Sequence, residues 1–349
     1  MSAIFQVGRG PLFSLLASRR GVSALVLAGL VTLGHAGPVQ AQDATPSDEA
    51  DAVEEAPAAE PFTIAAGGPF GVGFTVAGAI CVGVEGEAGG PPCSVRAIST
   101  SADRIRAVDS QAVDAAIVQA DWLAQAVAGR GLFEGDGPND RLTQIARLHS
   151  EDFVLMVPKD GSDDPSDLDG KLLDLQPEGS YPHAIASLLF GAMRMDLELG
   201  GDPAVAGFEG RIANLCDGKT VAAGFVAAQP HITLAGAVSR CGIKALGWPE
   251  TALKTAVEAF PGLEVDPIPD GLGAAAGTHT VGLRQILIMH RDTPKERGEA
   301  LARAVLAVQG DVASNLAVWR EVTPAGLKAK SPVGLHPGAV AAYAAAGVK

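Results

Sequence analysis

The sequence predicts an α/β fold of two lobes, each a mostly parallel sheet flanked by helices. The first indication is the stretch 93–122, which reads as strand, small-hydroxyl turn, short helix, apolar strand and polar turn. A similar strand–turn–helix junction recurs over residues 172–193. Strands that alternate with helices are typical of parallel sheets. The 349 residues are also enough for two domains with separate cores.

The stretch 93–122 also contains the strongest local signals for a ligand site. Residues 99–101 are Ser, Thr and Ser, which cap helices, and apolar residues then follow at helical spacing. The start of a helix exposes backbone N–H groups and a partial positive charge, which suit a carboxylate or phosphate. Residues 113–118 read as a buried strand, and Gln119 follows at its carboxyl end. Open α/β sheets bind ligands at that edge.

Before this stretch, residues 62–66 predict a first strand and the glycine-rich turn 67–73 leads into a helix from Thr75 to about Val84. The turn is not a dinucleotide fingerprint, because its glycines are spaced in the wrong order. It is better explained as a turn that lets backbone approach a ligand.

After Trp122 we expect a helix to Ala128 and then two strands, 144–148 and 153–157, flanking the polar segment 149–152. His149 and Glu151 in this segment are either an acid/base pair or, in the interpretation that we favour, part of a hydrogen-bonded crossover between lobes.

The second lobe is predicted to follow. A strand at 172–175 leads through the turn 177–183 into a helix, with Pro182 in its first turn. Strands follow at 221–226 and 243–246, and Gln229 opens a helix between them.

Two features in the second half of the chain, a Gly-Lys-Thr sequence and a histidine, give weaker indications of a functional site. Gly218-Lys219-Thr220 is not a phosphate loop, because it follows a helix and lacks the glycine five positions earlier. A strand at 281–289 and a helix at 293–308 return to the first lobe, and His336 is expected to be a packed histidine at a helix start.

The N-terminal 41 residues predict an export signal. They contain three arginines, no acidic residue and a short apolar run, with small residues before Gln42. The Ala/Pro-rich segment 42–61 is acidic and is expected to be a disordered tether. Without the signal, 23 basic residues face 40 acidic ones, which argues against nucleic acid and anionic membranes as partners. No later segment predicts a membrane span.

Four cysteines in an exported chain favour two disulfides. Their spacing suggests Cys81–Cys93 and Cys216–Cys241, although three connectivities are open from sequence. A metal site is the rival explanation, but there is no Cys-x-x-Cys and no histidine at ligand spacing from a cysteine. We therefore expect no metal and no cofactor.

The chain resembles the TAXI family, the extracytoplasmic solute-binding subunits of one branch of TRAP transporters, from about Phe62 to Lys349. The family pattern runs Cys-Ser-Val, Gly-Gly-Ser-x-Tyr-Asn, Asp and Val-Gln-Ser-Asp-Trp. The matching residues are Cys93, Ser94, Val95, Ser101, Asp114, Val118, Gln119, Asp121 and Trp122. The sequence departs from the pattern where Ser99 and Thr100 replace the glycines, Asp103 the tyrosine and Arg104 the asparagine.

The resemblance implies a type II periplasmic-binding-protein fold with its ligand cleft between the lobes. It assigns 62–157 and 276–349 to the first lobe and 158–275 to the second. It also implies that the protein delivers a glutamate-like amino acid or dicarboxylate to a TRAP-type permease. The expected ligand-binding residues are Gly71, Phe74, Ser101, Arg104, Gln119, Gly179, Ser180, Tyr181, His183 and Gln229.

Within this set, Arg104 is expected to pair with a solute carboxylate in bidentate fashion. The alternative is a solvated helix-face arginine paired with Asp103 or Asp109. Gln119 would contact the middle of the solute, and Gly179, Ser180 and His183 its far end.

We expect a periplasmic monomer without enzymatic activity, because no Gly-x-Ser-x-Gly, His-Glu-x-x-His or oriented acid/base pair occurs. Two other functions stay open: a binding module that presents its solute to a signalling receptor, and a diverged member with an altered ligand.

Overall fold

The computed structural model describes residues 60–69, 71–87, 89–176, 180–195, 198–200 and 207–349. The expected export signal, almost all of the acidic tether and Gly179 lie outside these residues. None of the helices in the described residues has the length and apolar character needed to cross a membrane.

The first lobe is built on a five-stranded part of the sheet. Strands β1 (Phe62–Ala66), β2 (Cys93–Ala97) and β3 (Ala115–Gln119) are parallel, in the order β2-β1-β3. Strand β10 (His279–His290) runs antiparallel beside β3, and β4 (Leu142–Pro158) runs antiparallel beside β10. Because β1, β2 and β3 are parallel, their carboxyl ends meet at one edge.

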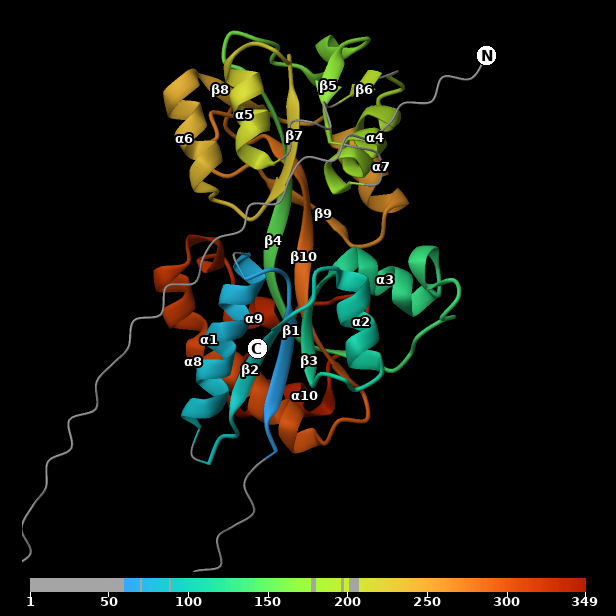
Figure 1. Ribbon diagram of the computed structural model, residues 1–349, viewed down its shortest axis with the longest axis vertical. Coiled ribbons are helices and arrows are strands. Elements are labelled where there is room, and N and C mark those ends of the chain that lie inside the picture. The colour runs from blue at the N-terminus through green and yellow to red at the C-terminus, as the bar shows by residue number, and fades with distance from the viewer. Residues whose placement is uncertain (1–59, 70, 88, 177–179, 196–197, 201–206) are drawn as a thin grey trace, which may run out of the picture. The chain divides into compact units, whose positions relative to one another are not determined.

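Helices cover both faces of this sheet (Figure 1). On one face α1 (Val72–Gly86), α8 (Lys295–Asn315) and α10 (Pro337–Ala345) share a core cluster with Ile117 of β3. On the other face α2 (Ser101–Asp109) and α3 (Ala120–Ala128) pack with Val118. This division follows from the alternation of side chains along a strand.

The second lobe continues the same sheet in the order β4-β7-β5-β6, with β8 paired to β4 and β9 to β10. Its strands are β5 (Leu172–Asp174), β6 (Glu198–Gly200), β7 (Ala223–Ala227), β8 (Ile243–Leu246) and β9 (Leu263–Pro267). Its helices are α4 (Tyr181–Ala192), α5 (Phe208–Cys216), α6 (Ile232–Cys241) and α7 (Glu250–Ala259). One core cluster contains α4 and α7, and a second contains α5 and α6.

Short helical turns complete the chain. They are the 3₁₀ turns Gly131–Phe133, Pro165–Leu168 and Ala317–Trp319 and the helix α9 (Pro324–Leu327).

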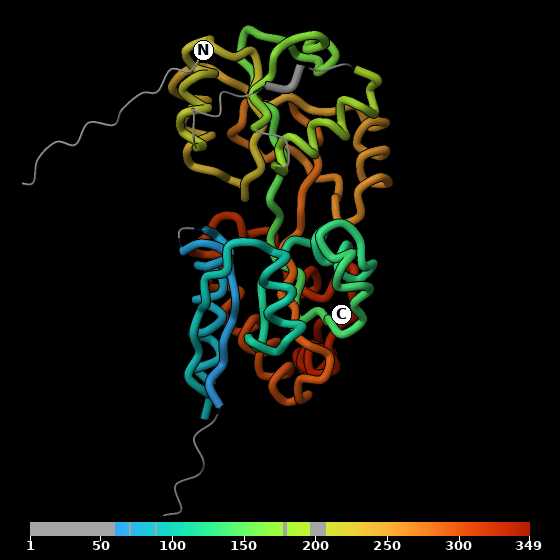
Figure 2. Tube along the Cα trace, turned by 45° about the vertical axis from the view of Figure 1, so that its right-hand side comes forward, coloured from blue at the N-terminus to red at the C-terminus, as the bar shows by residue number. Residues whose placement is uncertain are grey.

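Strands β4 and β10 connect the two groups of elements in both views (Figure 1, Figure 2). The expected break at residues 149–152 is wrong, because β4 is one strand of 17 residues. The reason is its pairing with β10, in which residues 150, 151 and 152 lie opposite 284, 283 and 282. We call these six paired residues the hinge ribbon. From Asp152 onward β4 also pairs with β7, so its partners change there.

Both disulfides that the cysteine spacing suggested are confirmed. Cys81–Cys93 joins α1 to β2, and Cys216–Cys241 joins α5 to α6. Each bond closes a short loop within one lobe, with sequence separations of 12 and 25 residues.

Candidate functional site

The first turn of α2 lies at the carboxyl edge of the first-lobe sheet. Thr100 caps it, since its hydroxyl accepts from the Asp103 amide at 3.0 Å and its carbonyl accepts from the Arg104 amide at 3.1 Å. The first four amides of a helix have no intrahelical acceptor. In α2 these are the amides of residues 100–103, and the Thr100 hydroxyl satisfies only that of Asp103. Within the first turn, the amides of Ser101 and Ala102 are therefore the donors available to a ligand.

Arg104 lies beneath this turn and is only 7% exposed. Its Nε donates to the Ile117 carbonyl at 2.6 Å, and Nη1 donates to the carbonyls of Ile98 and Ser99 at 2.7 and 3.1 Å. Its Nη2 donates to the Ser101 hydroxyl at 2.8 Å. A bidentate grip on a solute would require breaking these bonds. Burial lowers the pKa of Arg104, and Glu151 opposes that shift; the guanidinium stays charged.

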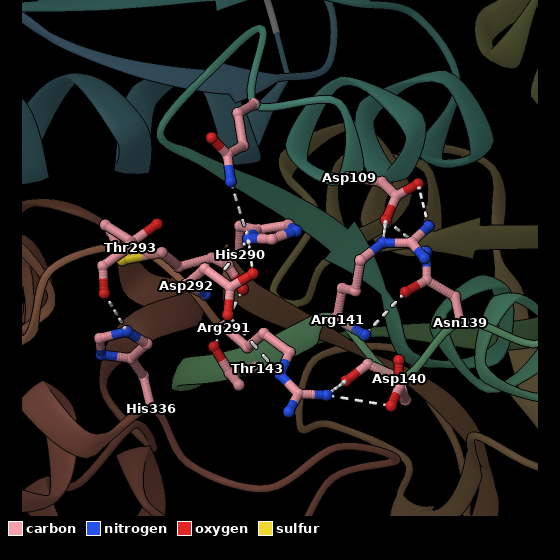
Figure 3. A network of polar contacts seen from close by, with 12 residues as sticks. Asp109, Asn139, Asp140, Arg141, Thr143, His290, Arg291, Asp292, Thr293 and His336 are labelled. Carbon is pink, nitrogen blue, oxygen red and sulfur yellow. Dashed lines mark hydrogen bonds and ion pairs between the residues drawn. The ribbon is translucent and has the colours of Figure 1, made fainter.

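The alternative that Arg104 is a solvated arginine paired with Asp103 or Asp109 is wrong. Asp109 accepts instead from Nε and Nη2 of Arg141, both at 2.7 Å, as Figure 3 shows. Asp103 pairs with Arg106 at 3.6 Å. Arg104 is therefore a buried charge held by backbone carbonyls.

The expectation that His336 is a packed histidine at a helix start is confirmed. Its Nε2 lies 3.1 Å from the carbonyl oxygen of Thr293, and Figure 3 shows the ring facing that carbonyl.

Gln119 connects α2 to the hinge ribbon. Its backbone N–H donates to the Ser101 hydroxyl at 3.2 Å, and Nε2 of its side chain donates to Oε2 of Glu151 at 3.0 Å. Glu151 is half-buried, and burial raises the pKa of its carboxyl, while Gln119 and Arg104 counteract this. Among the described residues, no Lys, Arg or His lies within ion-pair distance of Glu151.

Tyr181 brings the start of α4 to the same region. Its hydroxyl donates to Oδ2 of Asp121 at 2.6 Å, and its ring meets Trp122 edge-on with 6.1 Å between centroids. Asp121 is almost fully buried, and this burial raises the pKa of its carboxyl to about 6. Oδ1 of Asp121 has no partner within the part of the chain that the structure describes.

Within the described part of the chain, the hydrogen bonds of the other expected residues reach only residues nearby in the sequence. The Ser180 hydroxyl reaches the Leu175 carbonyl at 3.5 Å, and the ring of His183 lies 3.3 Å from the Gln176 carbonyl. At the start of α1, the carbonyl of Gly71 accepts from the Phe74 amide at 3.1 Å, and the Phe74 ring packs against the core cluster of that face.

Gln229 lies apart from this group, in a cavity of about 420 Å³ that it lines with His149, Asp152 and Arg284. Successive residues of a strand point to opposite faces. Ser150 and Asp152 therefore point away from the face of the hinge ribbon on which Glu151 meets Gln119. We call the Gln119 side the front site and the Gln229 side the rear cavity.

The structure thus brings Ser101, Arg104 and Gln119 together. Tyr181 lies beside this group through its hydrogen bond to Asp121, two residues after Gln119. Gln229 lies apart from the group, in the rear cavity. Sequence reasoning assigned Glu151 to a crossover and left Asp121 out of the ligand-binding set. For Glu151 a usable signal existed, because Glu151 and Asp152 stand directly before the apolar run 153–157, where buried acidic side chains are rare without a partner.

Comparison with known proteins agrees with this architecture. A TctC solute binding protein from Polaromonas superposes with a TM-score of 0.52 at 14% identity, over 81% of this chain and 95% of that chain. The aliphatic sulphonate binding protein SsuA from Escherichia coli gives 0.44 at 13% identity, over 82% and 83%. The glutamate-bound GluR0 ligand-binding core from Nostoc punctiforme gives 0.39 at 14% identity, over 75% and 98%.

Only the first of these likenesses has a TM-score above 0.5, and at its identity it shows the fold alone. The chain has the two-lobed α/β fold of type II periplasmic binding proteins, as the resemblance to the TAXI pattern implied. The sequence also matches the model of a protein family over residues 64–347, most of the chain. The chain belongs to the NMT1-like family.

Proposed function

We propose that this protein is an extracytoplasmic solute-binding protein that captures a glutamate-like amino acid in the front site. The observation that carries the proposal is the chain of contacts from Arg104 through Ser101 and Gln119 to Glu151. These contacts join the N-terminus of α2 to the half-buried carboxylate of Glu151. An anionic group of a solute can therefore bind at the helix end and a cationic group at Glu151.

The carboxylate of the solute would bind at the start of α2. The amides of Ser101 and Ala102 point out of the helix end, where the helix dipole favours an anion. Arg104 strengthens this site by its charge and fixes the Ser101 hydroxyl, so it acts as a positioning residue.

The ammonium group of the solute would pair with Glu151. A dicarboxylate would leave Glu151 beside a second negative charge, which is costly in a half-buried site. This favours an amino acid over a dicarboxylate. We propose further contacts from Gly71 and Phe74 in the first lobe and from Gly179, Ser180, Tyr181 and His183 in the second.

For its cellular role we propose export through residues 1–41 into the periplasm and delivery of the solute, by a monomer, to a TRAP-type permease. Support comes from the resemblance to the TAXI pattern and from the periplasmic-binding-protein fold. We propose that residues 62–157 and 276–349 form the first lobe and residues 158–275 the second.

Calorimetry with L-glutamate, L-glutamine and glutarate tests the proposal. We expect wild type to bind an amino acid at least about tenfold more tightly than glutarate, which lacks the ammonium group. Glu151→Gln should abolish this preference, whereas Glu299→Gln, on the distant helix α8, should preserve it. Equal or tighter binding of glutarate by wild type would refute the assignment of Glu151.

A further inference from the structure

The rear cavity is built from both lobes. His149 and Asp152 come from β4 and Arg284 from β10, while Gln229 follows β7 and Val318 and Val322 come from the segment after α8. Its volume of about 420 Å³ lies in the range of small-molecule sites and exceeds what one ion needs.

Three oxygen atoms converge at one point of its wall. A Cβ added to Gly282 would collide with Ser150 Oγ, Asp152 Oδ1 and Asp266 Oδ2. The Ser150 hydroxyl already donates to Asp266 at 2.9 Å. Asp152 is 6% exposed, and its Oδ1 has no partner among the described residues. We call these three atoms the oxygen cradle.

The charges around the cradle leave one carboxyl without a cation. Arg147 pairs with Glu264, and Arg284 pairs with both Glu264 and Asp266. The two arginines thus pair with two carboxylates, and Asp152 is a third carboxyl without a cationic partner. Burial and the neighbouring Asp266 raise the pKa of Asp152 to about 7, so its ionised form is stabilised only when a cation is bound beside it. At the exposed rim, Asp270 and Glu321 outnumber Arg320. The balance favours a monovalent cation.

His149 adds a donor to the same cavity. It is 2% exposed, and its Nδ1 accepts from the indole N–H of Trp319 at 3.3 Å. An indole N–H can only donate, so Nδ1 is the acceptor and the neutral ring carries its proton on Nε2. Burial lowers the pKa of His149 to about 3, which keeps the ring neutral. Its Nε2 has no partner within the described residues.

We propose that the rear cavity is a second binding site, for a small primary amine that also carries an oxygen acceptor. An alkylammonium group has three N–H donors, which match the three oxygens of the cradle. The acceptor would meet Nε2–H of His149. Both unpartnered buried atoms of the cavity, Asp152 Oδ1 and His149 Nε2, gain a partner in this way.

Ligand-observed NMR with 4-amino-1-butanol, and with 1,4-butanediol as its uncharged counterpart, tests this site on the full chain. We expect saturable binding of the amine and at least about tenfold weaker binding of the diol, because the diol cannot form the charge-assisted bonds. Equal binding of the two compounds, or no saturable binding of the amine, would overturn the proposal.

Substitutions in the oxygen cradle, compared with control substitutions elsewhere, test whether the amine binds at the cradle. Asp152→Asn should weaken binding of the amine about tenfold, while Asp140→Asn, at an exposed carboxylate outside the cavity that pairs with Arg291, and Glu151→Gln on the opposite face should leave it unchanged. Ser150→Ala removes one cradle oxygen without altering charge and should weaken binding several-fold, so it carries the test if Asp152→Asn does not fold. Wild-type affinity in a folded Asp152→Asn or Ser150→Ala protein would refute the site.

Discussion

The hydroxyl of Tyr181 donates a 2.6 Å hydrogen bond to the buried Oδ2 of Asp121. This contact joins the first turn of α4 to the first turn of α3, elements that pack in different core clusters. The front site lies beside it, since Gln119 is two residues before Asp121. The contact therefore holds the two sides of the proposed solute site together.

Tyr181→Phe should reduce both stability and solute affinity. The variant leaves both carboxyl oxygens of Asp121 unpartnered, which costs about 1–3 kcal/mol of unfolding free energy. Because the bond joins the two sides of the proposed solute site, its loss should lower the affinity at least about fivefold. Tyr343→Phe is the matched control, because the Tyr343 hydroxyl donates to the Ile145 carbonyl within the first lobe. It should destabilise the fold without changing affinity; a Tyr181→Phe protein that behaves in the same way would contradict this account.

Asp121→Asn should change the pH dependence of stability. The pKa of Asp121 is raised from 3.8 to about 6 in the folded protein, so between these values the folded state binds more protons than the unfolded state. Stability then falls as pH rises through this window, by about 3 kcal/mol in all. Asparagine does not titrate. Urea denaturation should show the variant gaining stability relative to wild type between pH about 4 and pH about 7, and a constant difference would show that Asp121 titrates normally.

Arg104→Lys should destabilise the protein although the charge is kept. A lysine cannot reach the carbonyls of Ile98, Ser99 and Ile117 together, so we expect a loss of about 3 kcal/mol in unfolding free energy. Arg106→Lys, two residues further along α2 on its exposed side, should cost less than about 1 kcal/mol. Equal stability of the two variants would indicate that Arg104 contacts solute instead of backbone.

Removing either disulfide should lower the free energy of unfolding, because the unfolded chain without the bond has more conformational freedom. Serine pairs at Cys81 and Cys93, or at Cys216 and Cys241, each open a loop and should lower the unfolding free energy by about 3 kcal/mol. Thiol titration of the native protein should find no free cysteine, since all four are paired. Reactive thiols before unfolding would contradict the pairing.

The sequence predicted the features that depend on local signals. Small hydroxyl residues fixed the start of α2, Pro182 lies in the first turn of α4, and β8 has the predicted bounds 243–246. The cysteine spacing also identified the right pairs, because both loops are short.

Features that depend on distant partners were not predictable. Arg104 is held by carbonyls on both sides of it in the chain, which no periodicity reports. Residues 149–152 look polar enough for a loop, yet pairing with β10 keeps them extended. That extension also decides that Glu151 and Asp152 face opposite sides of the strand.

Mass spectrometry of the solute that the protein retains from native extract decides whether the front site binds an amino acid. We expect a molecule with both an amine and a carboxylate, retained by wild type and by Asp152→Asn but lost from Glu151→Gln. A solute without an amine, retained equally by Glu151→Gln, would contradict it.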